Sequence, residues 1–155
     1  MIPLLVAVAT IFCTIIVHAL ILRVIVTAVR RDLQRGRVGV RFWTDLTFVT
    51  SATLLALAGH LVEIGLWAIA FYLCGEFSDF AAAFYHSAGS YTTLGDSSVV
   101  MSARWRLLGP LEASDGMLMF GISTAMIFAV IQRLLQSRFQ LADRQGDSAP
   151  PSNVS

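Results

Sequence analysis

The sequence predicts an all-α transmembrane fold, with three membrane-spanning helices and one shorter helix that enters the membrane without crossing it. Only 14% of the 155 residues are charged and 56% are hydrophobic, whereas a soluble domain averages about 25% charged residues. Three apolar runs each exceed the ~20 residues that a spanning helix needs. They cover Ile2 to Val29, Leu46 to Leu73 and Leu111 to Leu135.

Composition excludes several other classes of protein. The net charge of +1 gives no indication of nucleic-acid binding. Cys13 and Cys74 lie in or beside apolar runs and form no CxxC pair, so we interpret them as packing residues. With so little sequence outside the apolar runs, we expect a single integral membrane domain.

The arginines predict the orientation in the membrane. Seven arginines near the ends of the runs fall on one side and two on the other. The seven on the first side are Arg30, Arg31, Arg35, Arg37, Arg41, Arg138 and Arg144. The two on the other side are Arg104 and Arg106. Because positive residues stay in the cytoplasm, we expect the N-terminus outside and the C-terminus inside.

A short segment between the second and third runs is typical of a re-entrant helix. Residues 79–89 are compatible with a helix, with Ser78 as its N-cap and Asp79 in its first turn. Such a helix covers roughly 16 Å, about half of the hydrocarbon thickness. It is followed by the hydroxyl-rich stretch Tyr91 to Ser98. Irregular backbone at membrane depth must be buried in protein or line a wet cavity, so this stretch predicts a path for water or ions.

At this point the chain resembles a known family. A spanning helix, a short helix, Thr-Thr-Leu-Gly and a final spanning helix are similar to the pore module of tetrameric potassium channels. The chain resembles small bacterial membrane proteins of the two-helix-pore ion channel family more strongly. This similarity lies in the segments Trp105 to Glu112 and Gly116 to Gly121. The resemblance covers roughly Leu46 to Leu135. It implies a homotetrameric pore-loop architecture in a bacterial inner membrane.

The resemblance also implies which residues contact the ion. In the family, the filter Thr-Val-Gly-Tyr-Gly surrounds a dehydrated ion with backbone carbonyls from four chains. By position, Thr93, Leu94 and Gly95 match the first three filter residues, and Thr92 precedes them. We therefore expect a monovalent cation at Thr93, Leu94 and Gly95, with potassium permeant and sodium a second candidate, and no other cofactor.

The sequence then departs from the family. Asp96 replaces the Tyr, Ser97 the second Gly, and Ser98 the Asp that usually follows. Ser97 in a left-handed conformation would cost on the order of 1–2 kcal/mol, so the outer carbonyl sites are altered. Four Asp96 carboxylates would form an anionic ring, as in cation channels. Weak or altered potassium selectivity is the expectation.

Polar residues inside the spans have a structural and a functional interpretation. His60 and Glu63 share a helix face, and each ionised group in lipid costs about 2.5–3.5 kcal/mol, so both must face protein or water. They are either a proton- or ion-sensitive element, a buttress hydrogen-bonded behind the filter, or an internal polar pair that joins this helix to its neighbours. His86 on the short helix is a further candidate for either role, and His18 is expected to form a hydrogen bond between helices. The spacing of the three histidines predicts no metal site.

The third run is expected to line the pore. Gly116 and Gly121 are either gating hinges or sites of close packing. The pore-facing candidates by helical spacing are Ser123, Thr124, Ile127 and Ile131.

The chain is accordingly divided into three parts. Residues 1–41 form the first helix and an Arg-rich loop, 42–138 the pore module, and 139–155 a disordered tail. The favoured function is a passive cation channel in the lipid bilayer, and the alternative is a non-conducting, channel-like structural or regulatory subunit. An intramembrane enzyme built on Asp79, His86 and Ser87 has no supporting nucleophile–base spacing, so no enzyme is expected.

Overall fold

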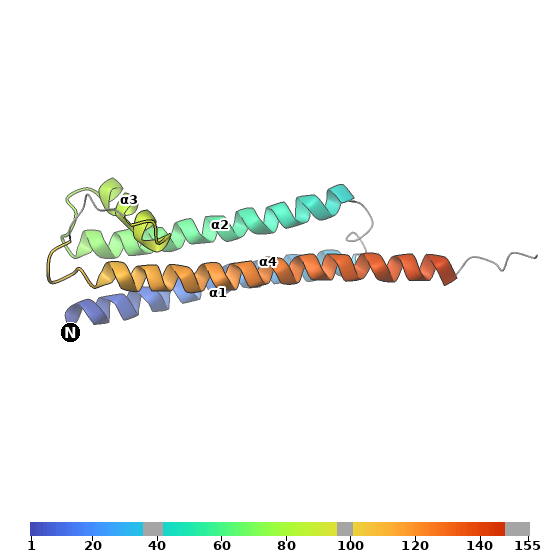
Figure 1. The fold of residues 1–155 in the computed structure, drawn as a ribbon, viewed down its shortest axis with the longest axis horizontal. Coiled ribbons are helices and arrows are strands. Elements are labelled where there is room, and N and C mark those ends of the chain that lie inside the picture. The colour runs from blue at the N-terminus through green and yellow to red at the C-terminus, as the bar shows by residue number, and fades with distance from the viewer. Residues whose placement is uncertain (36–41, 96–100, 148–155) are drawn as a thin grey trace, which may run out of the picture.

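The computed structural model describes residues 1–35, 42–95 and 101–147, and these form a helical bundle (Figure 1). The helices are α1 (Ile2–Gln34), α2 (Phe42–Leu73), α3 (Phe80–Tyr91) and α4 (Leu108–Asp147). Three of them are long and apolar enough to cross a membrane, over Ile2–Asp32, Trp43–Leu73 and Leu108–Gln136. For the described residues, the predicted all-α fold with three spans is confirmed.

The ends of α2 and α3 have clear local causes. Gly75, at a φ of 77°, follows the end of α2 and lets the chain turn. The Asp79 carboxylate caps α3 by accepting a hydrogen bond from the Ala82 N–H at 3.2 Å. The sequence had assigned this role to Ser78, so the predicted cap was one residue early. A carboxylate at this position also complements the helix dipole.

The last helix is longer than predicted. Residues 139–147 belong to α4, so the prediction of disorder from residue 139 is wrong for this stretch. The cause is composition, because Phe139-Gln-Leu-Ala-Asp-Arg-Gln consists largely of residues with good helix propensity. Residues 148–155 lie outside the described residues.

The three long helices pack through narrow faces. On α1, the buried residues recur at helical spacing and face α2 and α4; they are Ala7, Thr10, Thr14, His18, Ile25 and Val29. On α2, the small buried residues Ala52 and Ala56 let the neighbouring helices approach closely, as small residues do between membrane helices. Large apolar side chains such as Leu5, Phe12 and Leu54 point outward and are exposed, which suits a lipid or protein environment.

The short helix α3 ends beside Glu63, inside the apolar span of α2. It packs against α2 and α4 at the end of the bundle that also holds the N-terminus (Figure 1). Tyr91, its last residue, bonds to Glu63 of α2. Glu63 lies roughly 15 Å along the helix axis from Leu73, which is about half of a ~30 Å hydrocarbon core. The sequence had predicted a helix of half-membrane depth, and this geometry agrees with that prediction.

Close approach of α3 to α4 depends on Gly116. A Cβ at this position would lie 2.1 Å from the Tyr91 carbonyl oxygen and 3.0 Å from its carbon. A backbone carbonyl cannot yield to a new side chain as a flexible side chain can, so only glycine fits. At Gly121 a Cβ would meet nothing within 4 Å. Of the two interpretations left open, the structure therefore favours packing at Gly116.

We predict that Gly116→Ala destabilises the folded protein by about 1–3 kcal/mol, as expected for overpacking. Gly121→Ala is the matched control and should be neutral, or stabilising by up to ~1 kcal/mol through helix propensity. Thermal unfolding of both purified variants in detergent measures the difference. Equal stability of the two variants would contradict the close packing described for Gly116.

Candidate functional site

The candidate site is the loop Thr92–Gly95, which follows α3 and turns back along it. The Thr92 N–H donates to the Ala88 carbonyl at 3.2 Å, and the Gly95 N–H donates to the Gly89 carbonyl at 3.0 Å. Two residues make this reversal with positive φ angles, Thr93 at 61° and Gly95 at 74°. For Gly95 the conformation is easy, whereas for a β-branched residue such as Thr93 it is strained.

The whole loop is exposed in the single chain. Residues 92–95 are all solvent-accessible, and Leu94 is 85% exposed. Backbone groups at this depth cannot face lipid unsatisfied. They must therefore face water or further protein. Asp96 and Ser97, the remaining predicted filter residues, lie outside the described residues.

The environment of the loop is suited to a cation. The loop begins at the C-terminal end of α3, where a helix dipole contributes roughly half a negative charge. The Thr92 hydroxyl donates to the Ala88 carbonyl at 2.7 Å, and its oxygen keeps lone pairs for a ligand. Oxygen donors are the ligands that hard cations prefer.

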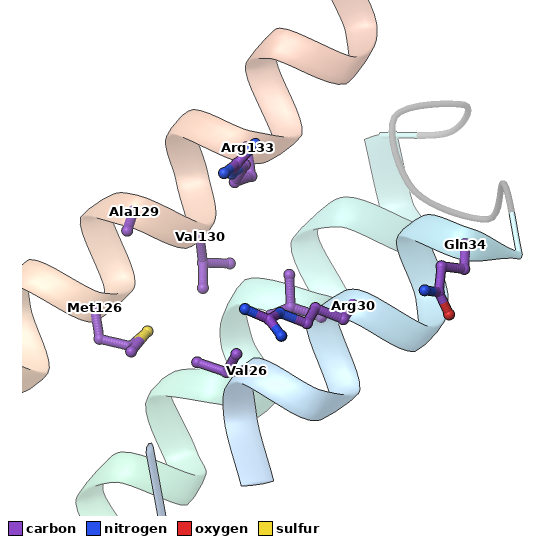
Figure 2. A pocket seen from close by; sticks show the side chains of 8 residues that line it. Val26, Arg30, Gln34, Met126, Ala129, Val130 and Arg133 are labelled. Carbon is purple, nitrogen blue, oxygen red and sulfur yellow. The ribbon is translucent and has the colours of Figure 1, made fainter. Parts of the chain in front are cut away.

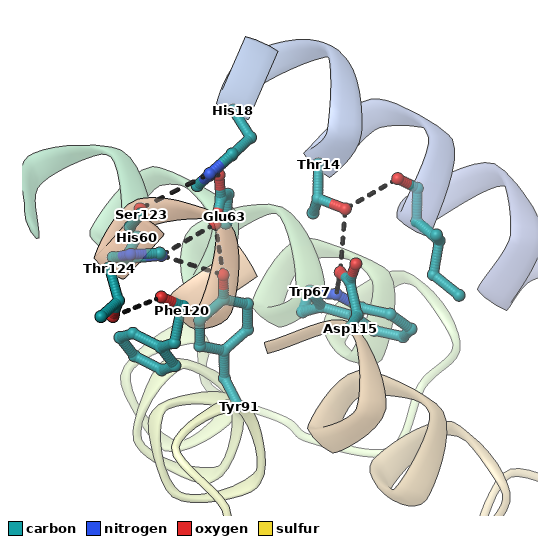
Figure 3. A network of polar contacts seen from close by, with 11 residues as sticks. Thr14, His18, His60, Glu63, Trp67, Tyr91, Asp115, Phe120, Ser123 and Thr124 are labelled. Atoms are coloured by element: carbon teal, nitrogen blue, oxygen red, sulfur yellow. Dashed lines mark hydrogen bonds and ion pairs between the residues drawn. The ribbon is translucent and has the colours of Figure 1, made fainter. Parts of the chain in front are cut away.

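A buried polar network supports the loop from behind (Figure 3). Its centre is the Glu63 carboxylate, which is fully buried. His18 Nδ1 of α1 lies 2.9 Å from Glu63 Oε1, and His60 Nδ1 lies 3.1 Å from Oε2. The Tyr91 hydroxyl donates to Glu63 Oε2 and lies 3.1 Å from His60 Nδ1. One carboxylate thus joins α1, α2 and the last residue of α3.

A second carboxylate, one turn further along the bundle, joins α1 and α2 to α4. Asp115 Oδ2 of α4 accepts hydrogen bonds from Thr14 Oγ1 at 2.8 Å and from Trp67 Nε1 at 2.9 Å. The Thr14 residue lies on α1 and Trp67 on α2. The other oxygen, Asp115 Oδ1, is buried without a hydrogen-bond partner among the described residues.

A third carboxylate holds α3 against α4. Ser87 Oγ lies within hydrogen-bond distance of both Glu112 Oε1 and the Ile64 carbonyl, the latter at 2.8 Å. A hydroxyl has one hydrogen to donate, so both contacts are satisfied when Glu112 carries a proton and donates it to Ser87. Glu112 Oε2 is also buried without a partner among the described residues, which favours the neutral carboxyl.

His86 does not join the residues around Glu63. Its ring lies in an aromatic cluster, with centroids 5.2 Å from Phe71 and 5.1 Å from Phe77. It thus packs α3 against the end of α2, away from Glu63. The other two residues considered for an intramembrane enzyme have structural contacts, since Asp79 caps α3 and Ser87 bonds to Glu112.

The cysteines lie apart from the polar network. Cys13 is exposed on α1, and Cys74 is partly buried after α2. Burial raises the pKa of the Cys74 thiol, which keeps it neutral. Partly buried Cys74 fits the packing role that the sequence assigned to it, whereas Cys13 is exposed and does not pack inside the single chain.

The predicted pore-facing set needs one correction. Ser123 is buried and its Oγ lies 3.5 Å from His18 Nε2, so it faces α1 rather than an open surface. Spacing alone could not fix the rotation of α4. Thr124 is exposed, and Gly121 is exposed as well.

A separate cleft of about 510 Å³ lies between α1 and α4 at the opposite end of the bundle (Figure 2). Figure 2 shows Arg30 and Arg133 on the two facing helices, and most of the other lining residues are apolar. Apolar walls with arginines at one end match the transition from lipid tails to headgroups. The cleft is distant from the loop and forms no part of the candidate ion path.

The candidate residues predicted from the sequence did not include three titratable residues of the network. Tyr91, Glu112 and Asp115 were not among the candidate site residues, although all three are fully or almost fully buried. The signal was present, because Glu112 and Asp115 are acidic residues at the start of an apolar span, and ionisable residues inside a span are functional candidates. Tyr91 lies four residues after Ser87, on the same face of α3.

We predict that Glu63→Leu destabilises the protein by about 2–5 kcal/mol. It removes the acceptor of three hydrogen bonds, two between helices and one within α2, each contributing about 0.6–1.7 kcal/mol in a membrane. Tyr91→Phe removes one of the three and should cost about 0.6–1.7 kcal/mol. Denaturant unfolding of the solubilised protein checks both values, and a Glu63→Leu variant as stable as the unchanged protein would refute the central role of this carboxylate.

The comparisons with known proteins agree with the geometry. The family model described as "Ion channel" matches residues 59–133, from the middle of α2 through α3 and the loop into α4. Neither the curated proteins nor the solved structures gave a significant match. The matched segment contains the re-entrant helix, the exposed loop and all three carboxylates. Over this segment, the chain is similar to the ion channel family with a two-transmembrane-helix pore.

Proposed function

We propose that this protein is a passive cation channel formed by four copies of the chain. In this arrangement four Thr93-Leu94-Gly95 loops surround one axis, with Thr92 at their inner end. Ions lose water at the loop carbonyls and move by mutual repulsion between neighbouring sites. Potassium passes, and selectivity over sodium is weak.

The observation that carries this proposal is the exposure of the loop at mid-membrane depth. Tyr91 anchors the end of α3 to Glu63, and the exposed residues 92–95 follow directly. A single chain cannot satisfy such backbone in lipid. Further copies that supply the same loop cover it and enclose water, which is the solution that pore-loop channels use.

Charge supports a cation rather than an anion. Four helix C-termini would point toward the axis, each with roughly half a negative charge. The sequence adds Asp96 directly after Gly95, which gives four carboxylates near the mouth of the pore. Rings of Asp or Glu favour cations.

Loss of strict potassium selectivity follows from the residues after Gly95. Asp96 and Ser97 replace the Tyr and Gly of the family filter, and a Ser resists the left-handed backbone that a second glycine permits. The outer sites are therefore altered, while the inner ones at Thr93 to Gly95 are kept.

The proposed location is a bacterial inner membrane, with the loop opening outward and the C-terminus in the cytoplasm. Arg30, Arg31 and Arg133 lie at the end of the bundle opposite α3. Positive residues favour the cytoplasmic side, which gives this orientation.

We predict cation flux from purified protein in liposomes, with a potassium-to-sodium ratio well below that of a strictly selective channel. Barium block and ion substitution measure permeation and selectivity, and cross-linking verifies the tetramer. Absence of cation flux from a verified tetramer would rule out the channel and support a non-conducting structural or regulatory subunit.

A variant that restores the family filter sequence should gain potassium selectivity. Combining Asp96→Tyr, Ser97→Gly and Ser98→Asp should increase potassium selectivity by tenfold or more, about 1.4 kcal/mol of discrimination. Gly121→Ala is the control, because a Cβ there meets nothing within 4 Å. A silent protein that conducts only after the triple substitution would favour the non-conducting alternative for the natural chain.

A further inference from the structure

We propose that His18, His60 and Glu63 form a binding site for one zinc ion, which joins α1 to α2 behind the filter loop. Each residue offers one ligand atom, and these atoms all lie within 4.8 Å of one another. All three side chains are buried. The site is separate from the proposed cation path and does not depend on whether the protein conducts.

The geometry brings the donors toward one point. His18 Nδ1 is 2.9 Å from Glu63 Oε1, and His60 Nδ1 is 3.1 Å from Glu63 Oε2. The two imidazole rings therefore present the same nitrogen to the same carboxylate from different helices (Figure 3). Ligands of a tetrahedral zinc ion at 2.0–2.2 Å are about 3.4 Å apart. The two quoted separations would widen by a few tenths of an ångström around the ion, and the remaining separations among the three ligand atoms are at most 4.8 Å.

The donor set is chemically selective. Two imidazoles and one carboxylate are a known zinc ligand set that leaves one coordination position open. Hard cations such as magnesium prefer oxygen ligands and retain water. A site with two imidazole nitrogens therefore selects against them. The Tyr91 hydroxyl, which contacts both His60 Nδ1 and Glu63 Oε2, lies beside the open position.

The surroundings provide the support that zinc sites require. A metal-bound histidine normally donates its second ring N–H to a nearby acceptor. His18 Nε2 lies 3.5 Å from Ser123 Oγ of α4, which can accept that hydrogen. One turn along α1, Thr14 bonds to Asp115, whose carboxyl group can offset the positive charge remaining on the zinc site.

One aromatic ring forms the cover of the site. The Phe120 ring lies over the His60 imidazole, with centroids 4.3 Å apart, and is 37% exposed. Entry of the metal ion is therefore expected past this ring. Phe120→Ala should speed metal uptake and leave the ligands unchanged.

Cobalt titration of the full-length protein tests the proposal. Chelator-washed protein in detergent is titrated with Co²⁺, and tetrahedral coordination is read from visible absorption. We expect one Co²⁺ per chain, displaced by Zn²⁺. His18→Gln and His60→Gln should each weaken binding by at least ~100-fold, and Ser123→Ala by about tenfold, as outer-shell changes do.

The controls separate this site from other metal-binding groups. His86→Gln removes a buried histidine outside the cluster, and Cys13→Ser removes an exposed thiol; both should bind Co²⁺ like the unchanged protein. A spectrum with thiolate bands, or binding that survives both His18→Gln and His60→Gln, overturns the site. Absence of any tetrahedral Co²⁺ spectrum does so as well, and the cluster is then a hydrogen-bond network only.

A histidine variant that fails to fold does not block the test. The unchanged protein still reports its ligands through the spectrum, where nitrogen and oxygen coordination without thiolate bands supports the site. Liposome flux is measured separately, so a failed zinc site and a failed channel give different results.

Discussion

The structure depends on a single buried carboxylate at the centre of a membrane bundle. Glu63 accepts hydrogen bonds from α1, from its own helix and from the end of α3. In lipid no water can replace these bonds, so the carboxylate and its donors must stay together. The apolar layers lie on either side of it, one around Trp67 and Phe71 and the other around Ile25 and Ala56. Apolar packing gives the bundle its cohesion, and Glu63 fixes where α3 ends.

This arrangement explains why the loop after α3 can be irregular. α3 is held at its end by Tyr91 and along its side by Ser87, which contacts both α2 and α4. The following four residues can then leave helical geometry without the helix itself moving. A rigid support beneath an irregular loop is the general requirement for a precise ligand site.

The fold could be predicted from sequence because its signals are local. The three spans follow from apolar length, and α3 follows from a run too short to cross the bilayer. The sequence predicted that His60 and Glu63 share a helix face and that His18 bonds between helices, but the full network could not be predicted, because it depends on the rotation of each helix. Ser123 illustrates this, since its spacing fitted a pore-facing position and the structure turns it toward His18. His18 and Glu63 lie 45 positions apart, so no spacing rule links them. The prediction of disorder for residues 139–147 failed for another reason. A polar sequence was interpreted as disorder despite its helix-forming residues.

The absence of a side chain at Gly116 has a mechanical consequence. There the Tyr91 carbonyl of α3 rests on the backbone of α4, one residue before the filter loop begins. Rotation or sliding of α4 at this level would press directly on that carbonyl. The two elements therefore move as one body near the loop. Any opening movement of α4 must bend the helix further along, beyond this contact, or else reshape the filter itself.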